Sequence, residues 1–169
     1  SRASILSGIR PTQDRFLTYY SSIHEAGPQS EHMVDYFNKR GYTTISNNKI
    51  THLKNDIKSW DEEWYPTDIS WRNYQDPKNR ELDNEKKPAA AYEMLDVDDK
   101  VYFDGLTAQK SIKDLKKLKN SNSPFFLAVG FVKPHLPFTA PKKYWDLYNE
   151  SDIKSVSYTH LRAHETFAN

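Results

Sequence analysis

The stretch FFLAVGF at residues 125–131 decides the fold class of this 169-residue chain. It is a continuous apolar run of strand length, as expected for a central strand of a parallel sheet that is covered on both faces. The segment YTTIS at residues 42–46 is β-branched and aromatic, and it predicts a second buried strand. Helical patterns lie around the two segments. This alternation predicts an α/β fold with a central, mostly parallel sheet flanked by helices.

Two helices are expected before the first strand. Residues 1–9 predict a short helix that ends at Gly8. The segment EHMVDYFNKRG predicts a second helix, with Ser30 as its N-cap and Gly41 as its stop. The side chains expected to line one face of this helix are Met33, Tyr36 and Phe37.

The chain between the two strands divides into an irregular part and a helical part. Residues 53–95 are polar, rich in Trp, Asn, Asp and Pro, and keep neither the helix nor the strand period, so we expect a long surface excursion. A long helix is expected after it, and KKYWDLYNES predicts a short amphipathic helix after the second strand. The expected apolar face of the long helix consists of Val101, Ala108, Ile112, Leu115 and Leu118.

The composition limits the classes of function. Lys and Arg number 24 and Asp and Glu number 23, so the net charge of +1 argues against a nucleic-acid partner. Without cysteine, the sequence holds no disulfide and no thiolate metal site. No apolar run approaches the roughly 18 residues of a membrane span. With a net charge this small, attraction of a charged ligand must come from a few cationic side chains at specific positions.

The last residues do not match the pattern of the rest. VSYTHLRAHET at residues 156–166 has no core pattern and resembles a translated sequencing adapter. We therefore expect residues 156–169 to be a non-native tail, and we discount His160 and His164 as ligands. Residues 1–155 would then carry the fold, in a chain that we expect to be cut at both ends.

Basic side chains follow both predicted strands. Lys49 and His52 come after the first strand, and Lys133 and His135 come after the second. Ligands of open α/β sheets bind beyond the carboxyl ends of the strands, so these side chains could meet there, together with Arg2. Cations and imidazoles so arranged suit an oxyanion such as sulfate, phosphate or carboxylate. The alternative is that both are ordinary surface loops.

The acidic residues near the long helix suggest no metal site. Asp98, Asp99 and Asp104 are oxygen ligands that would suit Ca²⁺ or Mg²⁺. Their segment, DVDDKVYFDG, lacks the spacing of a calcium-binding loop. Favourable charge at a helix N-terminus is the simpler interpretation.

Three segments together resemble the sulfatase family, in its iduronate-2-sulfatase-like branch. SRASILSGIRP resembles the second half of the Cys/Ser-x-Pro-Ser/Ala-Arg signature, and GYTTISNNKITH is similar to the family's Gly-Tyr-x-Thr-x-x-x-Gly-Lys-x-x-His segment. The region from YFDGLTAQK to KKYWDLY resembles the family's helix, central strand and Lys-Pro-His-x-Pro-Phe loop. Asn48 departs from the pattern, because the family usually has Gly before the lysine.

The resemblance implies an alkaline-phosphatase-like fold and the hydrolysis of sulfate esters, expected to be those of sulfated sugars. Residues 1–155 would be the central, incomplete part of the N-terminal catalytic domain, inactive by itself. Formylglycine, made from an upstream Cys or Ser, and Ca²⁺, with ligands outside this chain, would complete the enzyme. The resemblance also favours a periplasmic or secreted location.

The resemblance also assigns roles to individual residues. Arg2 would orient the formylglycine, and Lys49 would neutralise sulfate oxygens. His52 would contact the nucleophile and assist release of sulfate. His135 would contact sulfate and protonate the leaving alcohol, and Lys133 would shape the same pocket.

Aromatic residues of the excursion extend the expected site. Trp60, Trp64 and Tyr65 follow closely on the first basic loop and could line the substrate pocket, or they could only hold a long loop in place. Two other functions stay open on the sequence: a superfamily relative that hydrolyses phosphate mono- or diesters, and a non-catalytic carbohydrate-binding domain.

Overall fold

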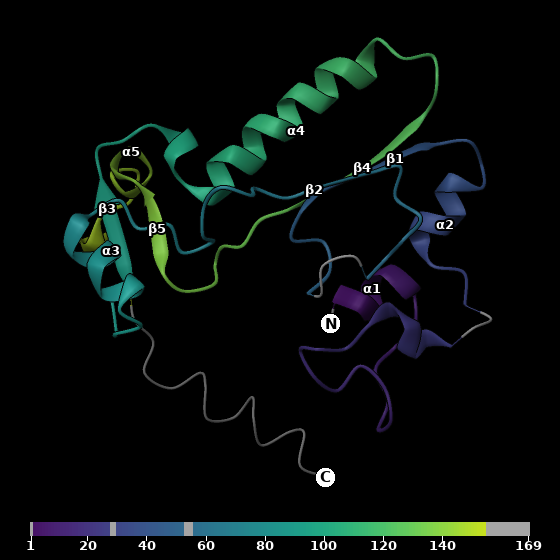
Figure 1. The fold of residues 1–169 in the computed structure, drawn as a ribbon, viewed down its shortest axis with the longest axis horizontal. Coiled ribbons are helices and arrows are strands. Elements are labelled where there is room, and N and C mark those ends of the chain that lie inside the picture. Colours follow the sequence, from purple (N-terminus) through teal and green to yellow (C-terminus); the bar gives the residue numbers. More distant parts are fainter. Residues whose placement is uncertain (1, 28–29, 53–55, 155–169) are drawn as a thin grey trace.

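The structure, a computed structural model, describes residues 2–27, 30–52 and 56–154. The expected non-native tail, with its two histidines, lies outside the described residues. Figure 1 shows the arrangement of the chain. In chain order, the helices and strands are α1 (Arg2–Ser7), η1 (Ile23–Ala26), α2 (Met33–Asn38), β1 (Thr43–Asn48), β2 (Glu62–Trp64), α3 (Pro77–Asn84), β3 (Tyr92–Leu95), η2 (Asp99–Val101), α4 (Phe103–Lys119), β4 (Phe125–Gly130), β5 (Phe138–Pro141), α5 (Lys142–Trp145) and η3 (Glu150–Asp152).

The larger sheet is parallel, and its strand order is β2-β1-β4. Both predicted strands are present, and β1 runs two residues beyond the predicted end. In the described part of the chain β1 is the central strand, buried from Thr44 to Asn48, whereas β4 lies at an edge. Residues 125–131 are expected to form a central strand, and among the described residues β4 pairs with β1. Phe125 and Val129 on β4 are 39% and 38% exposed.

Helices cover both faces of this sheet. Figure 1 shows α4 on one side of the strands and α1 and α2 on the other. On the side of α1 and α2, a buried apolar cluster joins Leu6, Ile23, Val34 and Ile57, and Phe126 of β4 packs against it. The mixed α/β architecture, with a parallel sheet flanked by helices, agrees with the predicted fold class.

The first two helices follow the prediction in place but not in every detail. The helix α1 ends before Gly8, which adopts a positive φ of 69°. The N-cap of α2 is His32, whose ring accepts from the amide of Asp35, so the predicted Ser30 cap is wrong. Val34 is the fully buried side chain of α2. The expected inward residues Met33 and Tyr36 are 38% and 43% exposed.

The helix α4 buries a polar face, which corrects the expected apolar one. Thr107, Ser111, Asp114 and Leu118 are buried, whereas Ile112 and Leu115 are 53% and 46% exposed. The reason lies on β1, whose buried Asn47 donates to Ser111 at 3.1 Å and to Asp114 at 2.7 Å. A buried amide without a hydrogen-bond partner costs free energy. The hydrogen bonds of Asn47 therefore favour packing of the polar face of α4 against β1.

The described part of the expected excursion, residues 56–95, is more ordered than expected. It contains β2, which completes the larger sheet, as well as α3 and β3, and β3 pairs in parallel with β5 in a second sheet. The buried carboxylate of Glu93 organises this second region. It accepts from the amides of Gln75 and Asp76 at 2.7 and 2.9 Å and from the Tyr102 hydroxyl at 2.9 Å. Side-chain to backbone bonds of this kind leave no period in the sequence, so the pattern missed the region.

Candidate active site

One cavity of about 720 Å³ lies where β1 and β4 end. Four of the predicted catalytic residues line it together: Arg2 from α1, Lys49 and His52 after β1, and His135 after β4. The other lining residues are Asn48, Thr51, Tyr65, Pro66, Thr67, Ile69, Ser70, Trp71, Phe103 and Val132. Parallel strands bring their carboxyl ends to one edge, so segments far apart in sequence supply one cationic site.

The end of β1 is shaped by Asn48. This residue has a φ of 67°, in the left-handed region that Asn tolerates better than most residues other than Gly. Its side-chain amide donates to the Thr107 hydroxyl of α4 at 2.8 Å, and the residue is 2% exposed. Asn48 therefore makes a turn that glycine would also permit, and it adds a hydrogen bond that holds the turn against α4.

The lysine next to this turn is held on its backbone. The Lys49 amide donates to the Gly130 carbonyl at 3.1 Å, and Arg2 donates through Nη1 to the Lys49 carbonyl. A Cβ at position 130 would lie 2.1 Å from the Lys49 carbonyl oxygen, so only glycine permits this approach. Arg2, Lys49 and the end of β4 are thereby fixed relative to one another.

The ring of His135 has one nitrogen engaged within its own loop. Its Nδ1 lies 2.6 Å from the Leu136 carbonyl oxygen. A carbonyl only accepts, so this contact places a proton on Nδ1 and leaves Nε2 for another partner. Trp71 meets the ring edge-on, with centroids 4.8 Å apart and an interplanar angle of 81°.

The charge of the site acts on His52. Partial burial lowers the pKa of His52, and the positive charges of Lys49 and Arg2 and the nearby His135 lower it further. The Lys49 ammonium also lies 3.5 Å from the His52 carbonyl oxygen. The cationic side chains of Arg2 and Lys49 in the lining favour a negatively charged ligand, and they oppose a further proton on the His52 ring.

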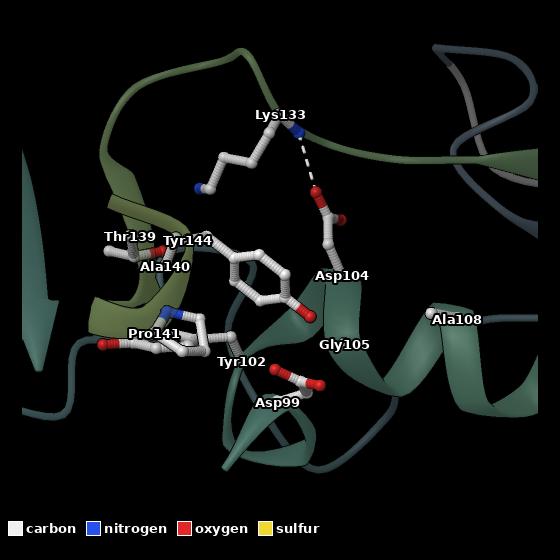
Figure 2. Close-up of a pocket in the computed structure, with 10 residues that line it drawn as sticks. All are labelled: Asp99, Tyr102, Asp104, Gly105, Ala108, Lys133, Thr139, Ala140, Pro141 and Tyr144. Carbon is white, nitrogen blue, oxygen red and sulfur yellow. Dashed lines mark hydrogen bonds between the residues drawn. The ribbon is translucent and has the colours of Figure 1, made fainter. Parts of the chain in front are cut away.

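Lys133 lies apart from the other four. Figure 2 shows its side chain in a second cavity of about 250 Å³, between the start of α4 and the β5–α5 region. Its ammonium is buried without a hydrogen-bond partner among the described residues, and burial lowers its pKa. The prediction that Lys133 shapes the same pocket is not supported by this placement. The two sides of the His135 loop face different cavities, and the sequence did not reveal that.

Of the three aromatic residues expected in the cavity, Tyr65 lines it, whereas Trp60 and Trp64 do not. Trp60 packs on Phe126 in the core, with ring centroids 5.8 Å apart and nearly parallel planes, and Trp64 lies beside Lys110. Neither lines the cavity, which instead contains Tyr65 and Trp71. The aromatic-rich composition identified the right segment, but only the fold determines which rings turn inward.

The cavity does not suit a hard metal ion. Among residues 2–27, 30–52 and 56–154, no group of three or more His, Cys, Asp or Glu side chains could hold a metal. The cavity lining contains cations, imidazoles and hydroxyls but no carboxylate. Calcium prefers several oxygen ligands with negative charge, so these residues fit an oxyanion and do not fit Ca²⁺.

Comparison with known proteins agrees with this geometry. The Sulfatase family profile matches residues 1–163. The chain is 30% identical to human iduronate 2-sulfatase over 90% of its own length and 29% of the relative's, and 31% identical to the mouse protein over 95% and 31%. It is 26% identical to the choline-sulfatase of Rhizobium meliloti (strain 1021) over 90% and 32%. The chain thus spans about a third of the length of these relatives.

The family match covers nearly the whole chain, and it includes every residue that lines the cationic cavity. No helix in the described part of the chain has the length and apolar character needed to cross a membrane. The chain belongs to the sulfatase family.

Proposed function

We propose that the protein of which this chain forms part hydrolyses sulfate esters in the cationic cavity. The observation that carries the proposal is the convergence of Arg2, Lys49, His52 and His135 on one cavity from three separate segments. Two fixed cations and two imidazoles form a donor set for a tetrahedral oxyanion. The names of the relatives, iduronate 2-sulfatase and choline-sulfatase, support sulfate as that oxyanion.

The proposed chemistry follows from where negative charge develops. During hydrolysis charge grows on the sulfuryl oxygens and on the departing alkoxide, and preorganised donors stabilise such charge. Lys49 neutralises the sulfuryl oxygens, and Arg2 adds a second cation beside it. Nε2 of His135 carries the proton to the leaving oxygen, since Nδ1 is engaged with the Leu136 carbonyl. His52 donates a ring N–H to an oxygen of the anion.

The nucleophile and the metal are proposed on the family resemblance alone. A formylglycine hydrate would supply the nucleophile that attacks sulfur. The described residues offer no ligand set for Ca²⁺. We propose that both groups come from other parts of the protein.

We further propose a sulfated carbohydrate as substrate. Tyr65 and Trp71 place aromatic rings in the lining beside the cationic residues. Rings of this kind offer flat apolar surface to the faces of a sugar, while the sulfate group meets the cations. A periplasmic or secreted location is proposed on the resemblance, and fractionation of cells that express the full-length protein tests it.

The deciding experiment compares turnover of an aryl sulfate and the matching aryl phosphate by the full-length protein. We expect kcat/KM for the sulfate to be higher, and Lys49→Ala to reduce it by roughly 10²-fold or more, as for loss of a charge-stabilising donor. Lys113→Ala, on the exposed face of α4, is the control and should leave it unchanged. Preferred turnover of the phosphate would favour a phosphoesterase, and sugar binding without any turnover would favour a carbohydrate-binding domain.

A further inference from the structure

The loop that carries His135 is attached to the start of α4 by one carboxylate. Asp104, in the first turn of α4, accepts the amide of Val132 through Oδ1 at 2.9 Å and the amide of Lys133 through Oδ2 at 2.9 Å. Figure 2 shows the second of these bonds. Hydrogen bonds to an ionised acceptor are among the stronger ones, and two of them fix both position and direction.

These two bonds act directly on the placement of the His135 ring. The two amides are the last donors before Pro134, and the loop then closes on itself, because the His135 amide donates to the Val132 carbonyl at 3.1 Å. Residues 132–135 thus form one tight unit, and Asp104 holds its first two residues. The ring itself makes its Nδ1 contact within the same loop, at Leu136.

The same helix also holds the other half of the site. Three residues after Asp104, Thr107 accepts the Asn48 side chain and fixes the turn before Lys49. One turn of α4 therefore sets the position of Lys49 relative to His135. Within that turn, Asp104 supplies the connection to the amides of the His135 loop.

We propose that Asp104 is a positioning residue of the reaction, and that its two-amide contact places His135 to protonate the leaving alcohol. This inference rests on the proposed sulfatase function. Asp104 does not line the cationic cavity, so it acts through the loop. Displacement of a reacting group by about 1 Å can cost roughly 10²-fold in rate.

Leaving groups distinguish this role from a merely structural one. An alkyl sulfate needs a proton on its departing oxygen, whereas 4-nitrophenyl sulfate releases a stable anion and needs little help. In the full-length protein, Asp104→Asn removes one of the two acceptors. We expect kcat for the alkyl sulfate to fall about 10²-fold and kcat for 4-nitrophenyl sulfate to fall less than about 5-fold, with KM nearly unchanged.

The control variant is Asp98→Asn, which makes the same charge change in the preceding exposed segment. Asp98 caps the amide of Lys100, which an asparagine can also do, and its ion pair with the Lys100 ammonium at 3.7 Å is exposed, so both rates should stay unchanged. In a His135→Ala background, Asp104→Asn should have no further effect on the alkyl sulfate, because the group it positions is gone. An equal loss for the two esters, or an additive loss without His135, would overturn the proposal.

Hydrogen–deuterium exchange separates failure of this inference from failure of the proposed function. In the wild-type full-length protein, the amides of Val132 and Lys133 should exchange slowly. In Asp104→Asn and in Asp104→Ala, at least one of these two amides should exchange about tenfold faster or more. Exchange in the other peptides should stay unchanged. Unchanged exchange at both amides would overturn the contact itself. If the wild-type protein hydrolyses neither sulfate ester, the proposed function and the positioning role both fall, whatever the exchange result.

Discussion

At the scale of single residues, Asn48 and Gly130 allow the backbone geometry that places the lysine of the site. Asn48 takes a left-handed φ, and Gly130 leaves the space in which the Lys49 carbonyl lies. Lys49, His52 and His135 each follow a predicted strand, but that pattern also fits ordinary surface loops, and it was the family resemblance that singled these residues out. The close approach at Gly130 could not be predicted, since it depends on the register of Asn48 with Gly130 across the sheet.

Gly130→Ala should weaken the site without unfolding the protein. A methyl group at this position meets the Lys49 carbonyl, so the backbone of Lys49 must move and Arg2 loses its acceptor. We expect kcat/KM of the full-length protein for an aryl sulfate to fall by roughly 10- to 100-fold. Val129→Ala, one position earlier on the same strand and partly exposed, is the control. Full activity of Gly130→Ala would show that the position of Lys49 is not critical.

Binding of inorganic sulfate should depend on pH through His52. The pKa of His52 is lowered in the free site, and a bound anion favours the protonated ring and raises that pKa. Affinity should therefore rise as the pH falls from about 8 toward 5, because the complex takes up protons more readily than the free site. Titration calorimetry of wild type and His52→Gln measures this effect. In the variant, the affinity for sulfate should increase less as the pH falls. If both proteins showed the same pH dependence of affinity, His52 would be excluded as its cause.

At the scale of elements, the polar contact between α4 and β1 is the feature that pattern reasoning missed. The helix was correctly predicted from its period, but the face chosen was the apolar one. The polar face packs against the sheet instead, because the buried amide of Asn47 requires Ser111 and Asp114 as hydrogen-bond partners. Lys110 adds ion pairs to Asp114 and to Glu62 of β2, both at 2.6 Å, and so connects α4 to the edge of the sheet. Long-range polar pairs of this kind are invisible to periodicity.

Asp114→Ala should therefore be strongly destabilising. It removes one of the two acceptors of the buried Asn47 amide and one of the two acidic partners of Lys110, and a buried polar or charged group that loses a partner costs about 2–4 kcal/mol. Chemical denaturation of the full-length protein measures the loss of free energy of unfolding. Lys116→Ala on the exposed face of the same helix should change it by less than about 0.5 kcal/mol. If Asp114→Ala changed the free energy of unfolding by as little as the control does, the polar contact between α4 and β1 would contribute little to stability.

At the scale of the whole molecule, the α/β class and the order of the main elements could be predicted, whereas the second sheet could not. The segments before β3 are joined to it by Glu93, whose backbone partners Gln75 and Asp76 leave no spacing that a sequence reader can recognise. The strand neighbours of β4 were equally hidden, because an apolar run does not say which strand pairs with it; among the described residues that strand is β1.

The chain expressed by itself should associate or fold poorly. Apolar side chains of α4 and β4 are exposed, among them Ile112 at 53%, Leu115 at 46% and Phe125 at 39%. Exposed apolar surface beside a strand edge promotes association. Size-exclusion chromatography with light scattering, followed by thermal unfolding, tests the expectation. A soluble monomer with a sharp cooperative transition would contradict it.

The central claim is that Arg2, Lys49, His52 and His135 form one site for the sulfate group. The most direct measurement is a crystal structure of the full-length protein with selenate, a heavier analogue of sulfate, located by its anomalous scattering. The account predicts a selenium peak in the cavity at the ends of β1 and β4, with oxygens within hydrogen-bonding distance of Lys49 and His135. A protein that binds selenate in solution but shows no peak in this cavity would contradict it.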